Sequence, residues 1–205
     1  MQVIDGIFYI IVLIMSVVIH EFAHGYVAYL LGDNTAKMSG RLTLNPIKHL
    51  DLFGSVILPL LLVISKAGFL IGWAKPVPYN PNNLRNQKWG AVWVALAGIG
   101  ANLALVIIFS IIIRLAPLVG ITAEPFYNIT SIIVLLNLVL FFFNIIPIPP
   151  LDGSKVLFAF LPPRFNGVQM FLEKYGIFVL LFFIIFIWNK VSPVIFFLFS
   201  FSTGL

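Results

Sequence analysis

Three residues within one pentapeptide have the types and the spacing that metal-assisted hydrolysis requires. They are His20, Glu21 and His24, in the run H-E-F-A-H. On a helix, residues four apart share one face with Cβ atoms about 5–6 Å apart, so both imidazoles can reach one Zn²⁺ at roughly 2.0–2.1 Å. Glu21 projects to the side of that pair, where it can reach a water beside the metal. The pattern predicts a zinc site with a carboxylate base next to it.

The sequence around this motif is too apolar for a soluble domain. Hydrophobic residues make up 61% of the 205 residues and charged residues 9%, whereas a soluble domain carries about 25% charged residues. Lipid must therefore be the solvent for much of the chain. His20 lies about 13 residues into an apolar run over residues 7–31, roughly 20 Å along a helix axis and so near mid-bilayer. A charged side chain there costs on the order of 2.5–3.5 kcal/mol. A bound cation would remove that cost. The alternative is that the two histidines are polar groups that join helices.

Two histidines leave a catalytic zinc site incomplete, because such sites commonly have three protein ligands and an open position for water. Asp152 is the candidate for the third ligand, since it follows the irregular run P-I-P-P-L at the end of an apolar segment. Broken backbone at membrane depth is tolerated where it is buried in protein or lines a wet cavity. The alternative role of Asp152 is to cap a helix that starts near Gly153. His49 is expected at the membrane interface, away from this site.

We predict an all-α membrane protein, a polytopic bundle of five to six transmembrane helices with short interfacial strands or re-entrant loops. One domain is expected over residues 1–205. A span needs roughly 20 mostly apolar residues, and the apolar runs predict spans over residues 7–31, 52–71, 89–115, 125–146 and 170–188. A short helix is expected over 154–161. Residues 191–205, after a break at Pro193, either form a sixth span or lie at the interface. The first span is expected to be retained, because no basic segment or small-residue cleavage site accompanies it.

Composition excludes several classes of protein. Without Cys there is no disulfide framework, thiolate metal site or Cys nucleophile. The net charge of +5 is scattered, so nucleic-acid binding has no support. Three histidines are too few for a membrane di-iron desaturase. Two alternatives to a metal-dependent hydrolase stay open, a membrane zinc or cation transporter and an inactive scaffold homologue. Transport sites usually lie between inverted repeats, and none is visible here.

Two motifs together resemble the site-2 protease family of intramembrane zinc metalloproteases. The first is His20-Glu21-Phe22-Ala23-His24, and the second is N-I-I-P-I-P-P-L-D-G from Asn144 to Gly153. The runs G-R-L-T-L-N-P, G-W-A-K-P-V-P and A-G-I-G-A-N, at residues 40–46, 72–78 and 97–102, look like a compact bacterial-type branch without a PDZ domain. The chain departs from the family at Ile99, where Pro is more common.

The resemblance implies a role for each matching residue. His20, His24 and Asp152 would ligate zinc, Glu21 would be the catalytic base, and Asn144 would lie near the reacting carbonyl. Further substrate or oxyanion contacts are expected from Asn102 and Val77. Asn144 and Asn102 could each instead be a polar group that joins helices.

The resemblance also implies a multi-pass protein of the cell membrane. Its substrates would be transmembrane proteins or remnant signal peptides, held in the lipid bilayer. The segments 40–46 and 72–78 would either hold an unwound substrate as edge strands or be plain loops.

Overall fold

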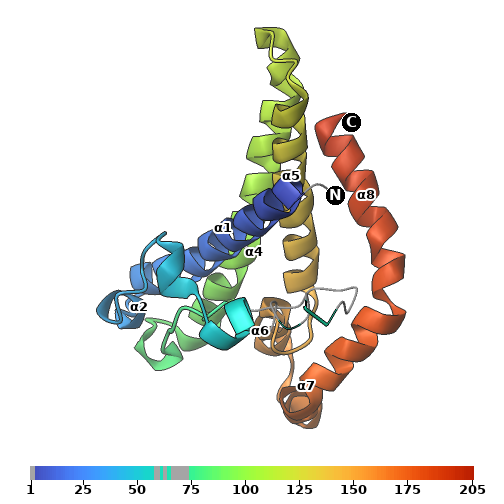
Figure 1. The fold of residues 1–205 in the computed structure, drawn as a ribbon. Helices are drawn as coiled ribbons and strands as arrows, with labels where there is room; N and C mark the ends of the chain where they lie inside the picture. The colour runs from blue at the N-terminus through green and yellow to red at the C-terminus, as the bar shows by residue number, and fades with distance from the viewer. Residues whose placement is uncertain (1–2, 58–60, 62–63, 66–73) are drawn as a thin grey trace.

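Four helical segments of the protein are long and apolar enough to cross a membrane. The computed structural model describes residues 3–57, 61, 64–65 and 74–205 (Figure 1). Within them the four segments are Phe8–Leu30, Gln87–Val119, Glu124–Ile145 and Pro163–Phe186. These described residues form helices, turns and loops and no strand, which confirms the predicted all-α membrane fold. Part of the predicted span over 52–71 lies outside the described residues. Leu52–Ile57 within it form a π-helical stretch.

Three helices form the centre of the molecule: α1 (Val3–Leu30), α4 (Gln87–Leu115) and α5 (Glu124–Ile145). α4 packs against both others, and Figure 1 shows α1 crossing the α4–α5 pair obliquely. The Asn86 side chain caps α4 by accepting a hydrogen bond from the Trp89 amide at 3.0 Å. Many outward-facing side chains of these helices are exposed apolar groups, as expected where lipid replaces water.

The chain between α5 and the last helices makes a tight bend. α5 ends at Ile145, residues 146–151 are irregular with a cis Pro149–Pro150 bond, and α6 (Asp152–Phe160) begins at once. Gly153 permits this bend, because a Cβ there would lie 2.6 Å from the Ile146 carbonyl oxygen. The start of α6 is therefore held against the end of α5.

α7 (Asn166–Phe186) and α8 (Trp188–Thr203) follow α6 and lie along one side of the central helices (Figure 1). The predicted break at Pro193 is wrong: the two helices are divided at Ile187, and Pro193 lies inside α8. Proline removes one backbone donor, and the carbonyl that would have accepted from it belongs to the exposed residue Asn189.

The loops that follow α1 and precede α4 are tied together by Asp33, which has no exposed surface. Its Oδ1 accepts hydrogen bonds from the Thr35 hydroxyl at 2.5 Å and the Asn83 amide at 2.9 Å, and its Oδ2 accepts from the Asn80 backbone N–H at 2.6 Å. Burial alone would raise the pKa of Asp33, but these hydrogen bonds hold it below its ordinary value. Asp33 is thus ionised at neutral pH and fixes the loop at 80–83 to the end of α1.

We expect Asp33→Ala to lower the melting temperature of the detergent-purified protein, because the Asn80 and Asn83 donors lose their acceptor. The loss corresponds to about 1–3 kcal/mol. The control is Asn34→Ala, at an exposed neighbour whose side chain caps no helix. Because the folded-state pKa of Asp33 is lowered, its contribution is present above the ordinary carboxyl pKa and is lost as pH falls through the lowered one. The difference between Asp33→Ala and the wild type should therefore shrink in acid. Equal melting temperatures at neutral pH would contradict this role.

Candidate metal centre

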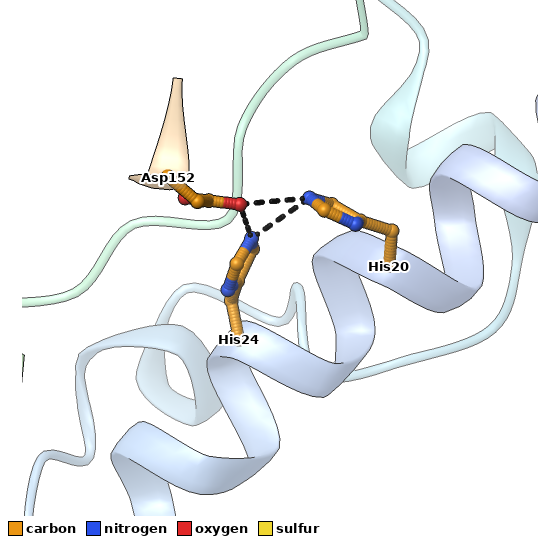
Figure 2. A group of neighbouring side chains, drawn as sticks. All are labelled: His20, His24 and Asp152. Atoms are coloured by element: carbon orange, nitrogen blue, oxygen red, sulfur yellow. Dashed lines mark hydrogen bonds and ion pairs between the residues drawn. The ribbon is translucent and has the colours of Figure 1, made fainter. Parts of the chain in front are cut away.

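His20, His24 and Asp152 meet in the interior, from helices that are far apart in the sequence. The Nε2 atoms of the two histidines are 3.0 Å apart, and Asp152 Oδ2 lies 3.1 Å from His20 Nε2 and 2.9 Å from His24 Nε2. Figure 2 shows the imidazoles one turn apart on α1 and the carboxylate facing them from the start of α6. All three residues are buried. The tertiary fold thus completes the three-residue set that the two motifs indicated.

The far side of each imidazole is held by α4. His24 Nδ1 lies 2.6 Å from the Val94 carbonyl oxygen, and His20 Nδ1 lies 2.6 Å from Asn102 Oδ1. A carbonyl oxygen only accepts hydrogen bonds, so the Nδ1 atoms carry protons, and each ring in its neutral form presents a bare Nε2. Such an outer hydrogen bond is the usual means of orienting a metal-ligating histidine.

With both rings neutral, the three atoms that face one another are all acceptors. Asp152 Oδ2 is buried without a hydrogen-bond partner. Three buried acceptors about 3 Å apart repel one another unless a cation lies among them. Ligand atoms about 2.0–2.1 Å from a tetrahedral zinc are about 3.3–3.4 Å apart, close to the spacing seen here. The donor set of two imidazoles and one carboxylate fits a divalent metal such as zinc.

Gly98 of α4 allows α1 to come this close. A Cβ at Gly98 would lie 2.5 Å from His24 Nε2 and 2.6 Å from His20 Cε1, well inside contact distance. The neighbouring Gly100 has nothing within 4 Å of such a Cβ. The two glycines of the run A-G-I-G-A-N thus have different roles, and only the first lies against the metal centre.

A cavity of about 210 Å³ opens beside the three ligands. Glu21 and Asn144 line it, as do Val77 and Lys155. Glu21 Oε2 accepts a hydrogen bond from the Val77 backbone N–H at 2.8 Å. The Asn144 amide donates to the Leu140 carbonyl of its own helix at 3.0 Å. A carboxylate and an amide therefore lie on the wall of a cavity that reaches the metal ligands.

Lys155 is a polar member of this wall that sequence reasoning missed. Its Nζ lies 3.0 Å from Asp152 Oδ1, the carboxylate oxygen that does not face the histidines. Burial alone would lower the pKa of Lys155, but attraction to Asp152 outweighs it and the pKa is raised. The signal was present in the spacing, because residues 152 and 155 lie three apart at the start of a helix.

Asn102 lies elsewhere than expected, and the alternative role of Asp152 as a helix cap is excluded. Asn102 has no exposed surface and stands behind His20, so it is not placed to contact substrate. Asp152 caps nothing: Leu151 is the N-cap residue of α6, and no side-chain cap is formed. His49 is buried, and its ring nitrogen Nε2 lies 2.8 Å from the Thr43 carbonyl oxygen, outside the metal centre.

The loops over residues 40–46 and 74–78 form no strand, and residues 72–73 lie outside the described residues. Val77 nevertheless borders the cavity through this loop.

The sequence also matches known proteins. Residues 8–131 and 115–187 match peptidase family M50. The chain belongs to this family. It is 42% identical over 177 residues to "Putative zinc metalloprotease YwhC" of Bacillus subtilis, covering 84% of this chain and 77% of that protein. It is 29% identical over 180 residues to "Putative zinc metalloprotease Rip2" of Mycolicibacterium smegmatis, with 83% and 64% covered. No solved structure matches. Membership in M50 agrees with the site-2 protease resemblance of the two motifs.

We expect Gly98→Ala to remove most of the divalent metal that the purified M50 protein binds, because the added methyl group forces α1 away from α4 at both histidines. Gly100→Ala is the matched control on the same helix and should keep wild-type metal content. Metal per chain is measured by elemental analysis after purification without chelators. Equal metal content in the two variants would show that Gly98 does not set the approach.

Proposed function

We propose that this protein is a zinc metalloprotease of the cell membrane that hydrolyses peptide bonds in or near transmembrane segments of membrane-protein substrates. One observation carries the proposal. Two bare imidazole nitrogens and a carboxylate oxygen converge within about 3 Å inside a lipid-facing bundle, and a second carboxylate, Glu21, lines the same cavity. The names of the curated relatives and the M50 family support the same chemistry.

His20, His24 and Asp152, which line the cavity, would hold the zinc. When bound there, zinc supplies Lewis-acid chemistry, polarising the attacking water and the scissile carbonyl. Glu21 accepts the proton of that water and delivers it to the leaving amine. Its hydrogen bond from the Val77 amide fixes one carboxylate oxygen, and the residue lines the cavity.

Asn144 is the proposed donor to the developing oxyanion. A side-chain amide carries two N–H groups, and the Leu140 carbonyl occupies one. The second can point into the cavity that Asn144 lines. A donor placed there would stabilise charge as it forms in the transition state.

The proposed substrates are transmembrane proteins or remnant signal peptides. Four apolar helical segments support location in the bilayer, where such segments diffuse. A cavity of about 210 Å³ is too small for an intact helix about 10–12 Å across. We propose that the reacting segment of the substrate enters unwound.

Glu21→Gln should bind zinc as the wild type does and lower cleavage by about 10²–10⁴-fold, the usual contribution of a general base. Cleavage is measured in membranes that contain single-span reporter proteins with helix-breaking residues, by the appearance of product on gels. The matched control is Glu173→Gln, at an exposed carboxylate of α7. Undiminished cleavage by Glu21→Gln would refute the mechanism and favour a transport role for the metal.

Asp152→Ala should lose zinc, because it deletes one of three ligands. It also leaves the ammonium group of Lys155 without its carboxylate partner. The measurement is zinc per chain in the purified protein, with Glu124→Ala, at an exposed carboxylate of α5, as the control. Wild-type zinc in Asp152→Ala would remove this residue from the metal centre.

A further inference from the structure

A chain of buried polar side chains leads from His20 away from the metal centre and across three helices. The Asn102 amide nitrogen donates to Asn137 Oδ1 at 2.8 Å. The Asn137 amide nitrogen donates to Ser16 Oγ at 2.9 Å and to the Ile133 carbonyl oxygen at 2.8 Å. Asn102 and Asn137 have no exposed surface, and Ser16 is 3% exposed. The proposed reaction does not use Asn137 or Ser16.

One backbone group determines the direction of the hydrogen bonds that link Asn137, Asn102 and His20. An amide side chain can be placed either way round, so its partners decide its orientation. The Ile133 carbonyl can only accept, so the nitrogen of Asn137 must face it and the oxygen of Asn137 must face Asn102. The nitrogen of Asn102 then faces Asn137, and its oxygen faces His20. His20 is left with a proton on Nδ1 and a bare Nε2.

We propose that Asn102 and Asn137 are positioning residues that fix the tautomer of His20. The Ile133 carbonyl sets the direction of the hydrogen bonds between them. This inference rests on the proposed zinc site, because a bare Nε2 is what a metal requires. Ser16 completes the hydrogen bonding of Asn137 but sets no direction, since a hydroxyl both donates and accepts.

Loss of this constraint would have a measurable cost. If the side-chain amide of Asn102 rotates by about 180°, its nitrogen faces His20 Nδ1. The neutral ring must then carry its proton on Nε2. A ring in that state cannot ligate the metal. The apparent dissociation constant rises in inverse proportion to the fraction of chains in the competent state. Removal of an outer-shell partner typically weakens metal binding by about 10–100-fold.

A simpler role for the same contacts is adhesion between α1, α4 and α5, because interhelical hydrogen bonds stabilise membrane bundles. Adhesion alone predicts a lower melting temperature with unchanged zinc affinity and an unchanged His20 ring. A positioning role predicts changes in both of these properties. The two roles are thus separable by measurements on the same purified protein.

The experiment measures zinc affinity of the full-length chain in detergent by competition with a chelator of known affinity. Asn137→Leu should weaken zinc binding by about 10–100-fold. Ser16→Ala should stay within a few-fold of the wild type, because the Ile133 carbonyl still orients Asn137. The matched control is Thr130→Val, which removes another buried hydroxyl group from α5. That hydroxyl bonds to backbone carbonyls of its own helix. This variant should bind zinc as the wild type does.

The second readout is the ¹⁵N resonance of the His20 ring in the metal-free chain, at a pH above the histidine range. Only three histidines contribute signals. Nδ1 of His20 should carry the proton in the wild type, in Ser16→Ala and in Thr130→Val, and should lose it in a fraction of Asn137→Leu chains. If Asn137→Leu does not fold, Asn137→Ser replaces it, because that hydroxyl can bond to the Ile133 carbonyl but is too short to reach Asn102.

Two results would overturn the inference: wild-type zinc affinity and ring protonation in the Asn137 variant, or an equal loss of zinc in Thr130→Val. A wild-type chain that binds no zinc would instead refute the proposed function. The ring measurement would then still decide the role of the asparagines, since it uses the metal-free protein.

Discussion

The structure depends on holding three acceptor atoms about 3 Å apart in a bundle surrounded by lipid. Each unsatisfied polar group there costs several kcal/mol, so the arrangement is tolerable only with a cation. The other polar atoms of the three ligands are occupied, by Asn102, the Val94 carbonyl and Lys155. Gly98 makes the arrangement possible, because any side chain at that position would meet both imidazoles. The small residue is therefore a requirement of the metal centre as well as of helix packing.

α4 serves the metal centre through one stripe of residues spaced by four. Val94, Gly98 and Asn102 lie along one face of the helix, matching the four-residue spacing of His20 and His24 on α1. His24 meets the Val94 carbonyl and His20 meets Asn102, so the two helices cross with opposite chain directions. A backbone carbonyl orients each imidazole. The Val94 carbonyl contacts His24 directly, and the Ile133 carbonyl acts on His20 through Asn137 and Asn102. Backbone geometry thus determines which ring nitrogens face the metal.

Sequence patterns predicted the elements of the site better than its supporting contacts. The HExxH spacing and the apolar runs were sufficient for α1, α4, α5 and α7, because helical periodicity and span length are local properties. The approach of Asp152 to α1 depends on a bend that no local pattern describes, and the family motif supplied it. Asn102 was misplaced, because one sequence does not show which face of α4 meets α1. The spacing of Val94, Gly98 and Asn102 was the available signal.

The loop before α4 connects access to the cavity with alignment of the base. It is attached at two points: the Val77 amide donates to Glu21 of α1, and the Asn80 backbone amide donates to Asp33, which follows α1. Prolines on both sides of Val77 restrict the backbone there, which limits how that amide can turn. Val77 also lines the cavity, so the loop that borders the cavity is the one that holds Glu21 by a hydrogen bond. The wall of the cavity and the position of the carboxylate base therefore depend on the same loop.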